Sequence, residues 1–273
     1  MRFFFLLLCS LSTGAIAATL RVDATTMRWN PEDKSLDQST FDSWKNGSVQ
    51  MPYVRGPDKT VAARINDYLF VEWMGMPAPP QHSKTAVVTG VSQTGSPAGT
   101  TRLEFSVVRN DGKVLAIQLN AEGCGAYCED YQTVRSFDAR TGRNLSANDF
   151  LTHQGQLLVA QRRAREAKTQ YQKMIATLKQ KLRSTSNRKT FDRDDLVARI
   201  DLNKECLTQT GKAPVTDAEW QGSLRNVEFS PLKNGLLFVS GRCSNHAERA
   251  LDDVGDINTL ILNSDLARFL TPY

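Results

Sequence analysis

The spacing of apolar side chains predicts two helices. After Asp58, apolar residues recur three and four positions apart from Val61 to Trp73, as they do on one face of a helix, and the proline-rich residues 76–80 end the pattern. The same rule predicts a longer helix over residues 156–183. Its apolar side chains fall within an arc of roughly 100°, and they are Leu157, Ala160, Ala164, Ala167, Tyr171, Met174, Ile175, Leu178 and Leu182.

A period of two predicts strands on both sides of the long helix. Residues 103–107 and 115–119 alternate apolar and polar side chains, and the Asn-Asp-Gly turn at 110–112 joins them as a hairpin. The same reasoning predicts strands at 86–88, 134–137, 227–229, 236–239 and 257–262, turns at 140–142 and 234–235, and a short terminal helix capped by Ser264. This order indicates an α+β fold: a mainly antiparallel sheet packed with helices, one of which is long, basic and amphipathic.

The first 17 residues have the three parts of a secretory signal peptide. Arg2 gives a positive start, an apolar run follows, and Ala15-Ile16-Ala17 provides a small-residue cleavage site. Cys9 follows Leu8 rather than the small residue that precedes lipid-modified cysteines. No later segment reaches about 18 consecutive apolar residues. We therefore expect a periplasmic or secreted protein with no transmembrane segment after signal cleavage.

Composition narrows the class of protein but names no activity. The 273 residues are 40% hydrophobic and 23% charged, which excludes collagen-like, coiled-coil and wholly disordered chains. The net charge is +5, and it becomes +4 when Arg2 leaves with the signal peptide.

We divide the chain into the signal peptide 1–17, an N-terminal segment 18–80 with one helix, and an α+β domain over 84–273.

An even number of cysteines remains after signal cleavage: Cys124, Cys128, Cys206 and Cys243. In an exported chain this favours two disulfides, and of the three connectivities we favour Cys124–Cys128 and Cys206–Cys243. Zinc is the alternative, because three thiolates and an imidazole make a possible tetrahedral set: Cys124, Cys128, Cys243 and His246. That set would leave Cys206 unpaired, so we expect no metal and no other cofactor.

Basic residues concentrate on the polar side of the predicted helix. Residues 156–189 carry ten basic side chains and one acidic one, a charge of +9. This pattern favours attachment to anionic polymers or lipids of the cell envelope, with an ordinary solvated helix face as the alternative. The candidate binding residues are Arg162, Arg163, Arg165, Lys168, Lys173, Lys179, Lys181 and Arg183. We expect Arg163→Ala to change the unfolding free energy by no more than about 0.5 kcal/mol, as at most surface positions.

The order of several short motifs resembles a known family. A Gly-Ala-Tyr turn at 125–127, a strand ending at Phe137-Asp138, a Thr-Gly turn at 141–142 and an Asn-Asp pair at 148–149 follow one another. This order is similar to that of a domain of unknown function that occurs in the extracellular part of lysozyme-sensing anti-sigma factors and beside some peptidoglycan deacetylase domains. The resemblance covers residues 50–273 and implies the fold, with cell-wall material or a muramidase as ligand.

Two departures from that family affect the expected ligand. Tyr127 stands where the family has a histidine, and two cysteines bracket the turn. The basic helix would also repel a basic lysozyme at close range.

The motifs of known hydrolases are missing from the sequence. It contains neither His-Glu-x-x-His nor Gly-x-Ser-x-Gly, and Ser186 and Lys189 match only the spacing of a Ser-Lys pair. The three histidines, His82, His153 and His246, are interpreted as surface or capping residues. We therefore favour a non-enzymatic module, without nucleic acid as a partner, that binds or senses anionic envelope polymers or a wall-associated protein. The alternative is a peptidoglycan hydrolase or deacetylase with a metal bound by Cys243, His246 and carboxylates.

Overall fold

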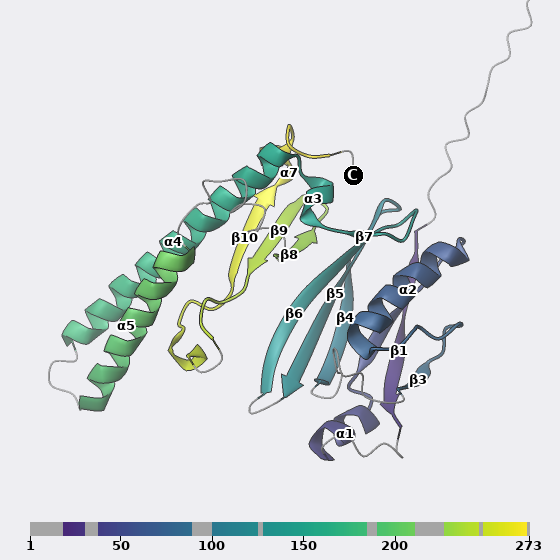
Figure 1. The fold of residues 1–273 in the computed structure, drawn as a ribbon, viewed down its shortest axis with the longest axis horizontal. Helices are drawn as coiled ribbons and strands as arrows, with labels where there is room; N and C mark the ends of the chain where they lie inside the picture. Colours follow the sequence, from purple (N-terminus) through teal and green to yellow (C-terminus); the bar gives the residue numbers. More distant parts are fainter. Residues whose placement is uncertain are drawn as a thin grey trace, which may run out of the picture.

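The structure is a computed structural model that confirms the α+β class. It describes residues 19–30, 38–88, 100–124, 128–184, 190–210, 227–245 and 248–271. Three small sheets follow one another along the chain, with helices at both ends of the molecule (Figure 1). The predicted signal peptide lies outside the described residues.

The N-terminal segment forms a mixed sheet with two helices, where the sequence pattern predicted only one helix. Its strands, in the order β2-β1-β3, are antiparallel between β1 and β2 and parallel between β1 and β3. The carboxylate of Asp58 caps the predicted helix by accepting from the backbone N–H groups of Thr60 and Val61, and Gly75 ends it in the left-handed conformation. The elements are β1 (Arg21–Trp29), α1 (Gln38–Lys45), β2 (Gln50–Arg55), α2 (Lys59–Met74) and β3 (Thr85–Val88).

The central sheet is antiparallel, in the order β4-β5-β6-β7. Its first hairpin is the predicted one, and Gly112 supplies the positive φ of 80° that the turn requires. Alternate residues of β5 point to opposite faces, so Leu115 packs into the N-terminal core while Val114 and Ala116 pack into a second core on the other side. The strands are β4 (Thr100–Asn110), β5 (Val114–Cys124), β6 (Cys128–Asp138) and β7 (Asn144–Leu145).

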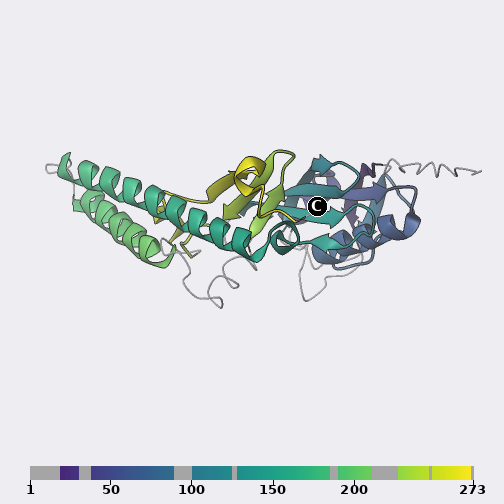
Figure 2. The ribbon, with the colours of Figure 1, turned by 90° about the horizontal axis from the view of Figure 1, so that it is seen from above.

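The C-terminal part combines a third sheet, in the order β10-β9-β8, with a hairpin of two long helices. Figures 1 and 2 place these helices at one end of the molecule, with α1 and α2 at the other. The helices are α3 (Ala147–Phe150), α4 (His153–Ser184), α5 (Thr190–Thr210) and α7 (Asn263–Leu266), with a 3-10 turn η2 (Arg249–Leu251). The strands are β8 (Glu228–Pro231), β9 (Gly235–Ser240) and β10 (Ile257–Leu262).

Several boundaries differ from the sequence predictions. The helix α5 was not predicted, and β6 begins six residues before the predicted strand at 134–137. The terminal helix follows β10 directly, with Leu262 rather than Ser264 at the capping position. These errors have a common cause, because each segment is defined by tertiary packing more than by its own periodicity.

Candidate functional site

The long helix α4 buries the apolar face that its sequence predicts. Six of the nine predicted residues are buried: Ala160, Ala164, Ala167, Tyr171, Ile175 and Leu178. Tyr171 belongs to a small core with Leu202 and Cys206 of α5 and Ile257 of β10. The helix therefore docks on a second helix and on a strand at once, at one end of the molecule (Figure 2).

Six of the eight basic candidates are exposed on α4, and we call this set the basic face. Its members are Arg165, Lys168, Lys173, Lys179, Lys181 and Arg183. With about 100° and 1.5 Å per residue, Arg165 and Arg183 share one line along the helix and lie about 27 Å apart. Lys168 and Lys179 lie within roughly 60° of that line, both on the same side of it, whereas Lys173 and Lys181 lie about 80° and 160° around the other side. Glu166 is the one acidic residue of the helix, and it lies on the side that faces β10.

The other two candidates contact neighbouring elements, which corrects the surface interpretation of Arg163. Both Nε and Nη2 of Arg163 donate to the hydroxyl of Ser240 on β9, at 3.1 and 2.9 Å. Burial lowers the pKa of this guanidinium to about 10. Arg162 forms an ion pair of 2.9 Å with Asp265 of α7. These two arginines therefore attach α4 to the third sheet and to the terminal helix.

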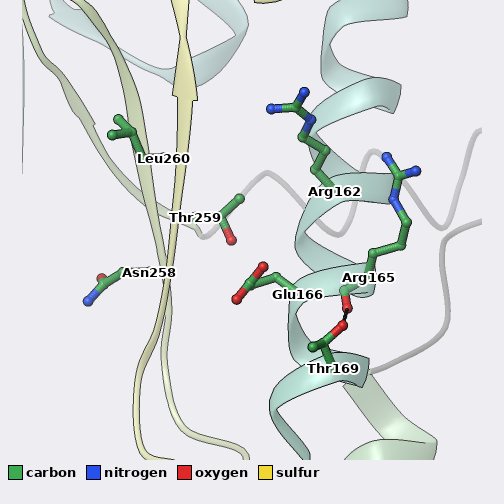
Figure 3. A pocket seen from close by; sticks show the side chains of 7 residues that line it. All are labelled: Arg162, Arg165, Glu166, Thr169, Asn258, Thr259 and Leu260. Atoms are coloured by element: carbon green, nitrogen blue, oxygen red, sulfur yellow. Dashed lines mark hydrogen bonds between the residues drawn. The ribbon is translucent and has the colours of Figure 1, made fainter.

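A groove of about 510 Å³ lies between α4 and β10, next to the basic face (Figure 3). Arg162, Arg165 and Glu166 line it on the helix side, and the strand contributes Thr259. The side chain of Thr259 points toward the helix, and among the described residues its buried hydroxyl has no hydrogen-bond partner. With Asp265 paired to Arg162, the groove is close to neutral and is less suited to an anion than the outer face.

The second helix of the hairpin compensates part of the positive charge. It carries five acidic and three basic residues, and Arg199 bridges Asp195 on the same helix and Asp253 after η2, at 2.8 and 2.9 Å. Asp252 accepts hydrogen bonds from Ser244 and from the backbone at 254 and 255. Asp195, Asp252 and Asp253 thus hold the hairpin and its neighbouring loop together.

The cysteines pair as favoured from the sequence. Cys124 and Cys128 close the tip of the β5–β6 hairpin with Cα atoms 4.0 Å apart. Cys206 and Cys243 join α5 to the segment after β9 at 5.6 Å. The zinc alternative is wrong, because its three thiolates belong to two different disulfides, while His246 lies outside the described residues. Two disulfides fit an oxidising compartment outside the cytoplasm.

The remaining histidines have ordinary surroundings. A ring nitrogen of His82 lies 3.2 Å from the carbonyl oxygen of Ala24, and His153 is exposed at the start of α4.

Across the described ranges, no group of three or more metal-ligating side chains comes together. Within the same ranges no helix is long and apolar enough to cross a bilayer. Ser186, Lys189 and the turn at 125–127 lie outside the described residues.

One charged cluster was missed by the sequence analysis. Arg135 of β6 binds Glu72 of α2 through Nε at 2.9 Å and Glu228 of β8 through Nη1 at 3.1 Å. Glu228 also accepts from the Thr133 hydroxyl and the Val134 backbone N–H, at 2.7 and 3.2 Å. Burial lowers the pKa of Arg135, but the two carboxylates outweigh that effect and raise it above its ordinary value.

This cluster borders a second cavity of about 420 Å³, lined among others by Tyr68, Asn144, Ser146 and Phe229. Burial, with Glu72 as the next cause, raises the pKa of Tyr68. Because the residues come from three distant segments, no local motif could reveal the cluster. The one available signal was the polar Arg135 within a predicted strand.

No family model matches the sequence, and no curated protein matches it significantly. Solved structures similar to the chain include a DUF3298 family member from Bacteroides fragilis, with 12% identity over 82% of this chain and 83% of that one and a TM-score of 0.43. A DUF3298 family protein from Pseudomonas aeruginosa has 13% identity over 82% and 85%, with a TM-score of 0.38. Both are domains of unknown function.

Proposed function

We propose that this protein is an exported, non-enzymatic module that attaches to anionic polymers of the cell envelope through the basic face of α4. The observation that carries the proposal is six exposed cationic side chains on a docked helix, four of which lie within roughly 60° of one line along it. The apolar side of α4 is occupied by α5 and β10, so the basic face is held in a fixed position. A rigid row of charges binds an extended polyanion with little loss of conformational entropy in the protein.

The chemistry of the site supports attachment rather than turnover. The thiolates that a catalytic metal would use are paired in disulfides. The carboxylates at 195, 252 and 253 are occupied by arginine and by hydroxyl and backbone donors. Export is supported by the signal peptide pattern and by the two disulfides.

The test compares two variants that lose the same number of charges. The first changes Arg165, Lys168, Lys179 and Arg183 to Gln on the basic face. The second changes four exposed lysines elsewhere to Gln: Lys59, Lys84, Lys113 and Lys233. Binding to poly(glycerol phosphate) and to phosphatidylglycerol vesicles is measured by titration from low to high salt, because screening weakens exposed charge interactions.

We expect the wild type to bind poly(glycerol phosphate) at low salt and to lose affinity as salt rises. The basic-face variant should lose at least about tenfold, while the matched control stays within about twofold, since a tenfold change corresponds to about 1.4 kcal/mol. Vesicle binding without polymer binding would indicate a lipid surface instead. Equal losses in the two variants, or no binding of the wild type at low salt, would overturn the proposal.

A further inference from the structure

Three exposed or half-exposed aromatic rings lie on one face of the molecule, where α2 crosses β6. Trp73 and Tyr131 stack with an interplanar angle of 9° and centroids 6.0 Å apart. Tyr68 is 39% exposed and Tyr131 is 44% exposed. Side chains two and four positions apart on a strand share a face, so Tyr131 and Arg135 point to the same side of β6 as Phe137, which Tyr68 contacts edge-on. The three rings therefore belong to one continuous surface.

Fixed polar groups lie between these rings. Arg135 is about 13 Å along the strand from Tyr131 and is clamped by Glu72 and Glu228. The cavity of about 420 Å³ begins beside Tyr68 and adds the amide of Asn144 and the hydroxyl of Ser146. The surface thus offers aromatic faces at both ends, with hydrogen-bond donors and acceptors held in place between them.

This combination matches the chemistry of a neutral oligosaccharide. One face of a pyranose ring is made of C–H groups and packs on an aromatic face, while its hydroxyls need planar donors and acceptors around the rim. Two glutamates and one arginine leave the cluster with a charge of −1, so an anionic sugar would be repelled. The length of the surface suits a short chain of sugars better than a single ring.

We propose that the surface formed by Tyr131, Trp73, Glu72, Arg135 and Tyr68 binds neutral oligosaccharides. This site is independent of the basic face, since it lies on the opposite part of the molecule (Figure 1). It also differs in its ligand, because it prefers an uncharged sugar to an anionic one. No step of catalysis is included, because the carboxylates are held by Arg135 and by the donors of β6.

The test is isothermal titration of the full chain with three neutral probes, namely cellohexaose, maltohexaose and N-acetylchitohexaose, and with hexagalacturonate as an anionic probe. We expect at least one neutral probe to bind with a Kd of about 1 mM or tighter, which corresponds to about −4 kcal/mol. Its binding should persist in high salt, and hexagalacturonate should not bind. This salt behaviour distinguishes the aromatic surface from the basic face, whose binding should weaken as salt rises. The outcome of the basic-face experiment therefore does not decide whether this proposal holds.

Variants locate the site. Tyr131→Ala and Tyr68→Ala should each weaken binding at least about tenfold. Glu72→Gln tests the ion pair with Arg135, because it removes the charge of Glu72 and keeps the size of the side chain. Leu260→Ala is the matched control, because it removes a side chain that is 48% exposed on β10. Circular dichroism confirms that each variant is folded. The proposal is overturned if no neutral probe binds, if the anionic probe binds more tightly, or if the tyrosine variants bind as well as the control.

Discussion

At the scale of single residues, Arg163 belongs both to a charged helix and to a packed interface. Its guanidinium lies against β9 and donates twice to one hydroxyl, that of Ser240. A long cationic side chain placed in this way stabilises through its aliphatic stem as well as through its hydrogen bonds. Arg165, two positions further along α4, points outward and has no such role.

These surroundings predict a stability difference between two neighbouring arginines. Arg163→Ala should lower the unfolding free energy by about 1–2 kcal/mol, because it removes buried packing and leaves the Ser240 hydroxyl without its donor. Arg165→Ala should stay within about 0.5 kcal/mol. Urea unfolding of the two variants measures the difference. Equal stabilities would mean that the contact with Ser240 contributes nothing.

The surroundings of Asp149 predict that the unfolding free energy depends on pH. Burial raises the pKa of this carboxyl, but hydrogen bonds from Arg143 and from the backbone N–H of Ser146 outweigh burial and lower it below the ordinary value of 3.8. A lowered folded-state pKa gives stability that is present above the unfolded value and is lost as the pH falls through the folded one. Asp149→Asn should therefore be destabilised at pH 7, and its deficit should shrink below pH 3.8. Unfolding curves at several pH values test this, and a deficit that does not change with pH would contradict it.

At the scale of elements, the two disulfides close loops of very different length. The pair 206–243 spans 37 positions and attaches α5 to the segment after β9, whereas the pair 124–128 spans four positions within one hairpin. In the chain-entropy account, the longer loop stabilises by about 4 kcal/mol and the shorter by about 2 kcal/mol. Replacing each pair by alanines should reproduce this order in denaturant unfolding. A larger loss for 124–128 would show that loop entropy does not govern the effect.

The elements also differ in how well the sequence predicts them. The apolar stripe of α4 was sufficient to predict that helix, because it is one face packed against a core. The alternation of β5 was sufficient to predict a strand, although both of its faces are buried in cores. In α5, charged and apolar residues occur around the whole circumference, since the helix contacts α4 and η2 on different sides and is tied by Cys206. The short α1 is held by Trp44, whose indole N–H donates to the carbonyl oxygen of Thr100, a partner that no local pattern indicates.

The candidate sites follow the same rule. The basic face lies on one helix, so its six residues were among the eight candidates that the sequence alone predicted. The other two candidates, Arg162 and Arg163, contact Asp265 and Ser240. These partners lie far along the chain, so the helix sequence alone could not reveal them. The aromatic surface around Arg135 joins α2, β6 and β8, which are far apart in the sequence, and it became visible only in the fold.

At the scale of the whole molecule, the second core joins the central sheet to the third sheet. Val114 of β5 and Val134 of β6 share it with Phe229 of β8 and Phe238 of β9. Phe229 contacts Phe150 of α3 edge-on, with centroids 5.6 Å apart, and stacks on Phe238 at 6.2 Å. This junction should make the two ends of the molecule unfold together.

The last prediction uses two spectroscopic signals from opposite ends. Trp29, Trp44 and Trp73 all lie in the N-terminal part, while α4 and α5 contribute most of the helical signal from the other end. In a Trp220→Phe background, fluorescence therefore reports the first core and circular dichroism reports the helical hairpin. The two transitions should coincide.

Phe229→Ala should separate these transitions. The substitution leaves a cavity in the joining core, at a cost of about 3–5 kcal/mol for a buried phenylalanine. The loss falls on the third sheet and its helices, so the circular dichroism midpoint should move to lower denaturant than the fluorescence midpoint. Leu260→Ala, on the exposed side of β10, should move neither. If both signals shift together in Phe229→Ala, the molecule behaves as one cooperative unit whose coupling does not depend on this ring.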